Sequence, residues 1–395
     1  MRGSNLYILL KSISAALSFV LTLALRILDY NIILADYALV ISAPLLIYGI
    51  IQLNTWKLIP LIGSRKLRYL RESYTIDVIV NLLVMVGALI LVEVVLLTSA
   101  NDISFDNYRF FFLIAIFDTS GTIEGYLRMQ DKYNKLNIGV ILGVIVKAFY
   151  FIAFLYNPSL ITQILFYHFV AILLERGLNI FSYWRAGQSL IPVQFSREFL
   201  ISNKITLWTL FVSSSGKAVM NRSDVYVLAM IFNKAVIADY FVGKQIARVV
   251  KLFADSIPKV IFPKLIVLNP TRLRVYNIKF RVSSLLVFIL VTLTLQIIKW
   301  NITELMFPIS LQSINTGILL IFTVFIGLML LPEGTKLLRN NRMAIYRKLI
   351  YLQLAIFVIF LFVFRSSVFI IPLAILVSQL AWFLGYVYVN SAFRK

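Results

Sequence analysis

Twelve stretches of apolar side chains, each about 20 residues long, dominate this chain of 395 residues. A helix of about 20 apolar residues is long enough to cross the hydrocarbon core of a bilayer. The pattern therefore predicts an all-α polytopic membrane protein with twelve transmembrane helices. The stretches cover residues 6–25, 37–56, 76–99, 109–127, 137–156, 160–183, 206–232, 240–262, 282–299, 310–332, 346–364 and 368–390.

The composition agrees with a membrane protein and excludes several other classes. Hydrophobic residues make up 61% of the chain and charged residues only 14%, which a soluble domain of this length would not need. The net charge of +21 would suit a nucleic acid partner, but no hydrophilic domain is present to display a basic face, so we expect none. With no cysteine and a single histidine, His168, we expect no disulfide, no metal site and no cofactor.

The basic residues predict the orientation of the helices, because Lys and Arg are enriched in cytoplasmic loops. With the N-terminus inside, 25 of the 38 Lys and Arg residues lie at the termini, in the inner connections or at the inner ends of the apolar stretches. Another 5 lie in the outer connections or at the outer ends of the stretches, and 8 lie deeper within the stretches. Both termini are therefore predicted to be cytoplasmic. The most basic inner loops, 65–71, 272–281 and 336–348, are expected to contact anionic membrane lipids.

A short internal repeat predicts that the chain contains two similar halves. Residues 32–40 read IILADYALV and residues 235–243 read AVIADYFVG, and both segments join the first two apolar stretches of a six-stretch half. Two six-helix halves have the same orientation, so they would form a parallel repeat. We expect an N-terminal six-helix lobe at 1–184, a cytoplasmic linker at 185–205 and a C-terminal six-helix lobe at 206–395.

Charged residues interrupt two of the apolar stretches, between residues 217 and 264. At 100° per residue, Lys244, Arg248, Lys251, Asp255 and Lys259 fall within about 80° of one helix face. Charges within a membrane are costly and usually face a wet cavity or one another. The first of these stretches carries Lys217, Asn221 and Asp224 on one face, with Arg222 beside it.

Several segments together resemble those of the Wzx-type lipid-linked oligosaccharide flippases, which belong to the multidrug/oligosaccharidyl-lipid/polysaccharide exporter superfamily. They are the run Asn221-Arg222-Ser223-Asp224, the segment ADYFVG at 238–243, the end IFPKL at 261–265, LADY at 34–37 after a helix that ends in Arg26, and EGYLRMQDKYNK at 124–135. The resemblance implies two six-helix lobes around a basic central cavity, and alternating access for an undecaprenyl-diphosphate-linked glycan of O-antigen or capsular polysaccharide synthesis. It also implies a location in the bacterial inner membrane, with the polymerase and the chain-length regulator of the same pathway as partners.

These observations give two sets of candidate site residues. Cations in a cavity of low polarity suit a diphosphate, and the candidates for that role are Lys217, Arg222, Lys244, Arg248, Lys251, Lys147 and Arg26. The candidates for coupling or charge balance are Asp224, Asp255, Asp118, Glu124, His168 and Glu175. The aspartates could instead neutralise the cations in structural ion pairs. His168 and Glu175 share a helix face with Asn179, which suits either a proton-coupling site or a packed histidine.

Two other functions are compatible with the sequence. An integral-membrane glycan polymerase would also have many helices and a basic lipid-diphosphate site, but the predicted outer connections are too short for a catalytic loop. A drug exporter of the same superfamily would be expected to have a less basic cavity. We therefore expect a transporter rather than an enzyme.

Overall fold

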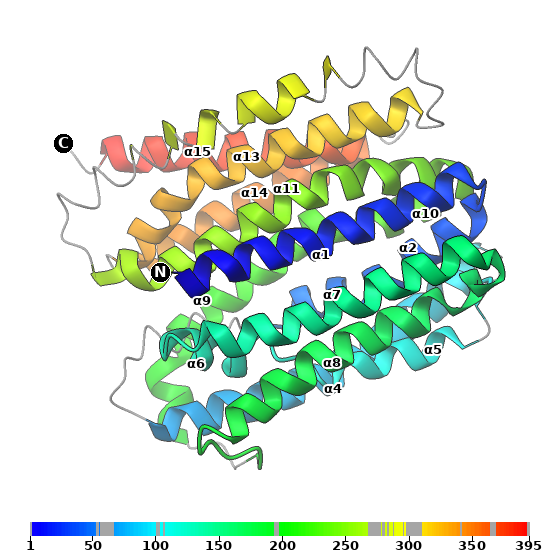
Figure 1. The fold of residues 1–395 in the computed structure, drawn as a ribbon. Coiled ribbons are helices and arrows are strands. Elements are labelled where there is room, and N and C mark those ends of the chain that lie inside the picture. Colours follow the sequence, from blue (N-terminus) through cyan, green and yellow to red (C-terminus); the bar gives the residue numbers. More distant parts are fainter. Residues whose placement is uncertain are drawn as a thin grey trace. The chain divides into compact units, whose positions relative to one another are not determined.

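All regular structure in the described part of the computed structural model is helical, and most of the helices are long (Figure 1). The structure describes residues 2–52, 55, 67–99, 103–105, 107–192, 197–267, 278, 281–282, 284–286, 288–294, 296–297, 310–339, 342–363 and 369–392. Within these residues, eight helical segments are long and apolar enough to cross a membrane. The prediction of an all-α polytopic membrane protein is therefore confirmed.

Each predicted apolar stretch contains helix, and the stretch at 282–299 is described only in part. In the first half the helices are α1 (Arg2–Ile27), α2 (Asn31–Ile51), α4 (Leu67–Ser99), α5 (Tyr108–Phe111), the 3-10 helix η1 (Phe112–Ala115), α6 (Thr122–Met129), α7 (Tyr133–Tyr156), the 3-10 helix η2 (Pro158–Gln163) and α8 (Ile164–Trp184). In the second half they are α9 (Arg197–Arg222), α10 (Asp224–Ile231), α11 (Lys234–Val267), α13 (Leu311–Arg339), α14 (Met343–Val363) and α15 (Ile370–Ala392).

Two predicted stretches are interrupted where polar residues compete for the backbone. The stretch at 109–127 forms α5, η1 and α6, and the residues from Ile116 to Gly121 between them are not helical. The stretch at 206–232 is divided at Ser223 into α9 and α10. Arg222 therefore lies in the last turn of α9, and Asp224 lies in the first turn of α10. Both charges complement the helix dipoles at these ends.

The chain forms two compact units. The first contains Met1–Leu21 and Ala35–Met230, and the second contains Thr22–Leu34 and Ile231–Lys395. The lobe boundaries predicted from the sequence, 1–184 and 206–395 with a linker between, concern successive parts of the chain and stay a prediction.

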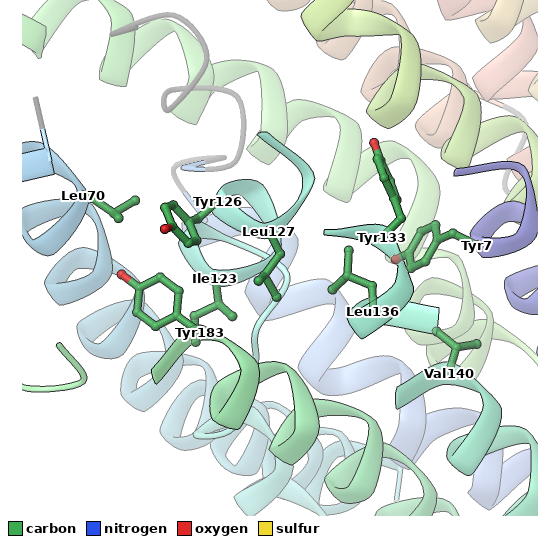
Figure 2. Packing of buried hydrophobic residues seen from close by; sticks show 9 residues of the cluster. All are labelled: Tyr7, Leu70, Ile123, Tyr126, Leu127, Tyr133, Leu136, Val140 and Tyr183. Atoms are coloured by element: carbon green, nitrogen blue, oxygen red, sulfur yellow. The ribbon is translucent and has the colours of Figure 1, made fainter. Parts of the chain in front are cut away.

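In the first unit, α7 packs along α8, and the broken segment packs between α4 and α8. Figure 2 shows the buried cluster that holds α6 in this position. Tyr126 of α6 meets Tyr183 of α8 edge to face, with 5.5 Å between the ring centroids. Leu127 and Tyr183 are completely buried. The short α6 is thus anchored by aromatic packing on α8.

One face of α4 is buried and the opposite face is exposed. The buried face carries Ile76, Val80, Val84, Ala88, Val92 and Val95, and the exposed face carries Ile79, Leu82, Leu83, Val86, Ile90, Val94 and Leu97. Both rows have the spacing of three and four residues that keeps side chains on one side of a helix. Such a row of exposed aliphatic side chains in a membrane protein is the surface that contacts lipid.

In the second unit, α11 and α13 cross at two glycines. A Cβ atom at Gly243 would come within 3.0 Å of the backbone oxygen of Ser313 and of the Thr316 side chain. Gly317 lies opposite, against the backbone oxygen of Gly243. The Ser313 hydroxyl donates to the backbone oxygen of Asp239 at 2.8 Å. Small residues at this crossing allow the two backbones to approach closely, as is common in membrane helix pairs.

We expect Gly243→Ala to destabilise the second unit, because a backbone oxygen cannot rotate away from the new methyl group as a side chain could. The expected loss is about 1–3 kcal/mol, the usual cost of overpacking, measured as a lower Tm of the purified protein in detergent. Gly177→Ala on α8 is the matched control, since its Cβ would meet nothing within 4 Å. An unchanged Tm for Gly243→Ala would contradict the close crossing.

Candidate functional site

The basic stripe of α11, which consists of Lys244, Arg248 and Lys251, is half-buried along its length. The Arg248 Nη1 donates to Oε1 of Gln245 at 3.4 Å, and the Gln245 side chain is itself buried. Asp255 and Lys259 of the predicted stripe lie further along α11, and their side chains are outside the described residues. The structure therefore keeps three of the four predicted cations on one helix, in a partly desolvated setting.

The basic stripe points away from α13. The residues of α11 that touch α13 include Gly243 and Ile246, which meet Gly317, and Asp239, whose carbonyl accepts from Ser313. At 100° per residue these contacts lie about 150° around the helix from the centre of the basic stripe. The stripe is thus not part of the α11–α13 contact.

Arg222 holds a backbone carbonyl in the first unit. Its Nη1 donates to the Leu45 oxygen of α2. Nearby, Ser214 and Ser215 of α9 donate to the carbonyl oxygens of Gln52 and Ile50. These bonds run between α9 and the C-terminal half of α2 with the residue that follows it. The structure thus gives Arg222 a role in joining two helices, and its predicted role in binding a diphosphate stays a prediction.

The other two residues predicted near Arg222 differ sharply in exposure. Asp224 is buried, at 2% relative exposure. Lys217 is exposed on α9, and its backbone oxygen accepts from Nδ2 of Asn221 at 2.8 Å. The break at Ser223 separates the two residues, so they do not share one continuous helix. Lys217 can reach solvent or a headgroup without desolvation.

Arg26 belongs to the second unit and forms an ion pair there. Its Nη2 lies 2.8 Å from Oδ1 of Asp239, and its Nη1 donates to Asn31. The two charged side chains have relative exposures of 19% and 17%. Asp239 occupies the middle of the ADY repeat. The corresponding residue of the first half, Asp36, instead accepts from the backbone nitrogen and hydroxyl of Ser104.

Lys147 and His168 share a cleft in the first unit. Lys147 on α7 donates to the Ser14 hydroxyl of α1 at 2.9 Å. The His168 Nδ1 lies 2.8 Å from the Tyr37 hydroxyl, and its ring also meets Phe111 edge to face. Lys147 and His168 both line the cleft. The packed, hydrogen-bonded histidine that the sequence offered as one alternative is thus present, and a coupling role for it is untested.

Two of the remaining candidates form ion pairs nearer the start of α1. Glu175 on α8 pairs with Lys11 of α1. Glu124 pairs with Arg128 one helical turn away, and the same Arg128 donates to the Tyr7 hydroxyl. Charged and polar side chains of α1 therefore satisfy groups on α6, α7 and α8. Pairing of this kind is how a membrane protein accommodates ionisable side chains.

The break before α6 contains a polar cluster that includes Asp118. Asp118 lies 3.6 Å from Arg176, and its Oδ1 accepts from the backbone nitrogen of Ser120. Arg176 also donates to the Ile114 oxygen at 2.7 Å. The cluster thus satisfies backbone groups that the missing helical turn leaves without partners.

Asp77 caps the broken segment and is a residue that the sequence analysis missed. Its Oδ2 accepts from the Thr122 nitrogen at 2.6 Å, and its Oδ1 accepts from the Thr55 hydroxyl at 2.8 Å. A Cβ at Gly121 would come within 3.0 Å of the Asp77 carboxylate and of the Thr55 hydroxyl, so a larger residue there would displace this cap. A carboxylate at a helix N-terminus satisfies free amides and the dipole. The available signal was an acidic residue near the start of the apolar stretch at 76–99.

The candidate cations therefore fall into two groups. Lys147, Lys217 and Arg222 belong to the first unit, and Arg26, Lys244, Arg248 and Lys251 belong to the second. Among the residues that the structure describes, no three His, Cys, Asp or Glu side chains are grouped so that they could hold a metal ion.

We expect Arg26→Ala to destabilise the protein, because it leaves the Asp239 carboxylate partly buried without its cation. The expected loss is about 3 kcal/mol, typical of breaking a buried pair, read as a lower Tm in detergent. The double exchange Arg26→Asp with Asp239→Arg should recover part of it.

Arg109→Ala is the matched control for this prediction. Arg109 pairs with Glu93 at 2.8 Å, but its side chain is 68% exposed, so its loss should leave the Tm nearly unchanged. If Arg26→Ala left the Tm unchanged and affected transport alone, the structural role of the pair would be wrong.

Comparison with solved structures identifies the fold. No protein-family model matches the sequence, and no curated protein matches it. Among solved structures, a MATE transporter in complex with MaL6 matches with a TM-score of 0.61 and 10% identity, over 99% of this chain and 95% of the other. A multidrug resistance MATE family transporter of the MOP superfamily, in an outward-facing conformation, matches with a TM-score of 0.58 and 11% identity, over 99% and 95%.

A third structure agrees with the first two. A eukaryotic MATE transporter matches with a TM-score of 0.52 and 12% identity, over 98% of this chain and 93% of the other. Identities this low establish the fold and no more. The chain thus has the two-lobed fold of the MATE transporters along nearly its whole length.

Proposed function

We propose that this protein is a flippase, which moves an undecaprenyl-diphosphate-linked oligosaccharide from the cytoplasmic to the outer leaflet by alternating access. Proteins of this fold include the MATE transporters, and this supports transport as the general activity. The observation that carries the more specific proposal is the half-buried basic stripe of α11. A transporter with this fold needs a group that recognises its substrate, and the stripe selects for anions.

The spacing of the basic stripe suits a compact anion with several charges. Lys244, Arg248 and Lys251 follow one another by four and three residues, so their side chains lie along one face within about two helical turns. Charge-assisted hydrogen bonds to phosphate oxygens are about twice as strong as neutral ones. Partial burial strengthens them further, because water screens the charges less. A diphosphate could accept bonds from all three side chains.

The membrane potential supports the proposed direction. In a bacterial inner membrane with both termini in the cytoplasm, outward movement of a negative diphosphate follows an inside-negative potential. The gain is about 2.3 kcal/mol for each charge at 100 mV. Transport of such a substrate therefore has a driving force even without a coupled ion.

Two alternatives remain as competing proposals. A drug exporter fits the same fold, and the partly buried cations argue against it for cationic drugs, because like charges repel. An integral-membrane glycan polymerase needs a catalytic platform outside the membrane. The described connections at 28–30, at 157 and at 232–233 are too short to provide one.

The pathway partners follow from the proposed substrate. The polymerase and chain-length regulator that use the exported glycan would be its partners, together with membrane lipids.

The double variant Arg248→Ala, Lys251→Ala should lose lipid-linked glycan translocation by at least tenfold, measured in proteoliposomes by protection of the glycan from an added glycosidase. The reason is the loss of two charge-assisted bonds to the diphosphate, each worth about 1.5–3 kcal/mol. Arg248→Lys should keep part of the rate. Lys336→Ala on α13 is the control, since Lys336 is an exposed cation of the same unit. Wild-type rates in the double variant would remove the diphosphate-binding role of the stripe.

Loss of the protein in its native cell should separate a flippase from a polymerase. Without a flippase, single lipid-linked repeat units should accumulate facing the cytoplasm, because neither the glycan nor the diphosphate crosses hydrocarbon unaided. Without a polymerase, single units would cross and become accessible from outside. The measurement is digestion of the accumulated units by an added glycosidase in intact and in lysed spheroplasts. Digestion of single units in intact spheroplasts would exclude the flippase.

A further inference from the structure

A row of hydrogen bonds joins α2 to α9 and α10 within the first unit. Each donor is a side chain of α9 or α10, and each acceptor is a backbone carbonyl of α2 or of the residue that follows it. The pairs are Ser214 with Gln52, Ser215 with Ile50, Arg222 with Leu45 and Tyr226 with Leu39. The donors advance along the chain while the acceptors go back, so the helices run antiparallel here. The row therefore continues past the break at Ser223.

Apolar packing anchors the α9 part of this row. Leu207 and Leu210 of α9 belong to a buried cluster with Ile76 of α4, and side chains of α2 pack against the same cluster. Further along, a Cβ atom added at Gly49 of α2 would lie only 2.4 Å from the Cβ of Ala218. This closeness requires a glycine in α2. The part of α9 that precedes the break is thus packed firmly on α2 and α4.

Both helices have a weak point at the same level. On α9, the Asn221 and Ser223 side chains each donate to the carbonyl one turn back, and such bonds often bend a helix. On α2, Pro44 has no N–H group and removes one helical hydrogen bond. Pro44 precedes Leu45, whose carbonyl accepts from Arg222. A bend at this level would separate α10 from α2 and leave α9 in place.

Two polar bonds hold this bend closed. Tyr226 of α10 is 4% exposed, and its hydroxyl donates to the Leu39 oxygen at 2.7 Å. Arg222 donates to the Leu45 oxygen. A carbonyl oxygen has two lone pairs, so Leu39 and Leu45 can lose these bonds and keep those of their own helix. Release of the two side chains therefore does not disrupt α2.

We propose that α10 is an outer gate of the transporter, which moves away from α2 about Ser223 when Arg222 and Tyr226 release their carbonyls. The far end of α10 leads into the connection at 232–233, which is predicted to lie on the outer side. The inference rests on the proposed transport function, because alternating access requires a segment that opens to the outside. The anchored part of α9 stays on α2 during this movement.

The strength of the two bonds suits a gate. A hydrogen bond adds little net stability, because water competes for both of its groups when it breaks. The two conformations of a switching protein differ by a similarly small free energy. Loss of one bond should therefore raise the open population without unfolding the segment.

Cysteine reactivity tests the gate, because the chain contains no native cysteine. Val225→Cys places a single thiol on α10 at a position that is 0% exposed, and Leu210→Cys places one on the anchored part of α9 at a position that is 2% exposed. The rate of alkylation by N-ethylmaleimide, measured by mass spectrometry on the full-length protein in nanodiscs, reports how often each position opens. We expect the thiol of Val225→Cys to react about tenfold faster or more.

Removal of either bond should open the gate further. Tyr226→Phe removes only the hydroxyl, so alkylation of Val225→Cys should become about two- to tenfold faster. Arg222→Ala removes a charged donor, so its effect should be about tenfold or larger. The thiol of Leu210→Cys should react at the same rate in all three backgrounds.

Matched controls separate a gate from loosening of the whole row. Ser214→Ala with Ser215→Ala removes the two bonds on the anchored side and should leave the alkylation rate of Val225→Cys unchanged. Tyr156→Phe, at a position on α7 that is 88% exposed, should also have no effect. The Tm in nanodiscs shows whether each variant is folded. If Val225→Cys lowers the Tm, Leu228→Cys replaces it, since Leu228 of α10 is also 0% exposed.

Three results would overturn the gate. The first is equal protection of the thiols in Val225→Cys and Leu210→Cys. The second is an unchanged rate for Val225→Cys when it is combined with Tyr226→Phe. The third is equal acceleration of both thiols by Tyr226→Phe, because this would show that α9 leaves α2 together with α10.

The outcome is separable from that of the proposed function, because thiol reactivity is measured without a substrate. If the protein translocates a lipid-linked glycan and Val225→Cys is as protected as Leu210→Cys, the flippase stands and the gate falls. If the gate opens as expected and no lipid-linked glycan is moved, the flippase falls, and the gate belongs to a transporter of another substrate.

Discussion

The cost of placing polar groups in hydrocarbon governs where the buried charges in the described part of this chain are found. A bilayer core has no water to satisfy a free amide, a carbonyl or an ionised side chain, so the protein must supply the partner itself. Lys11 is paired with Glu175 and Arg128 with Glu124, and Lys147 donates to Ser14. Each contact joins helices or successive turns, so the same bonds that neutralise charge also fix how the helices pack.

The interrupted segments follow from the same requirement. Ending a helix inside a membrane exposes backbone groups, and both breaks are surrounded by side chains that replace the lost partners. Asp77 and Thr55 cover the start of α6, and Arg176 covers a carbonyl of η1. At the other break, Arg222 and Asp224 stand at the helix ends where their charges are favoured. At both breaks in the described part of the chain, polar or charged side chains therefore stand beside the interrupted backbone.

The sequence allowed the helical class and most helix positions to be predicted, because the apolar stretches have the length that a bilayer requires. Breaks were harder to predict. Nothing in the hydropathy of 109–127 shows that the backbone leaves the helix near Asp118, since the partners that stabilise the break come from α4 and α8. Periodicity placed Lys244, Arg248 and Lys251 on one face correctly.

Periodicity could not predict which residue each charged side chain contacts. Asp239 was recognised as part of a repeat, but its pairing with Arg26 depends on two segments more than 200 positions apart in the chain. The grouping of His168 with Lys147 likewise depends on how α7 packs against α8. Long-range contacts of this kind leave no trace in the spacing of residues along one helix.

The length of the exposed aliphatic face of α4 indicates which bilayer thickness suits the protein. Its exposed aliphatic row begins at Ile79 and ends at Leu97, and at about 1.5 Å per residue this row is about 27 Å tall. The hydrocarbon core of an ordinary bilayer is about 30 Å thick. A much thicker bilayer would draw the polar residues that precede Ile79 into hydrocarbon, and a much thinner one would leave Leu97 in water. The thickness of the surrounding lipid therefore sets how deeply the Asp77 cap of the broken segment is immersed.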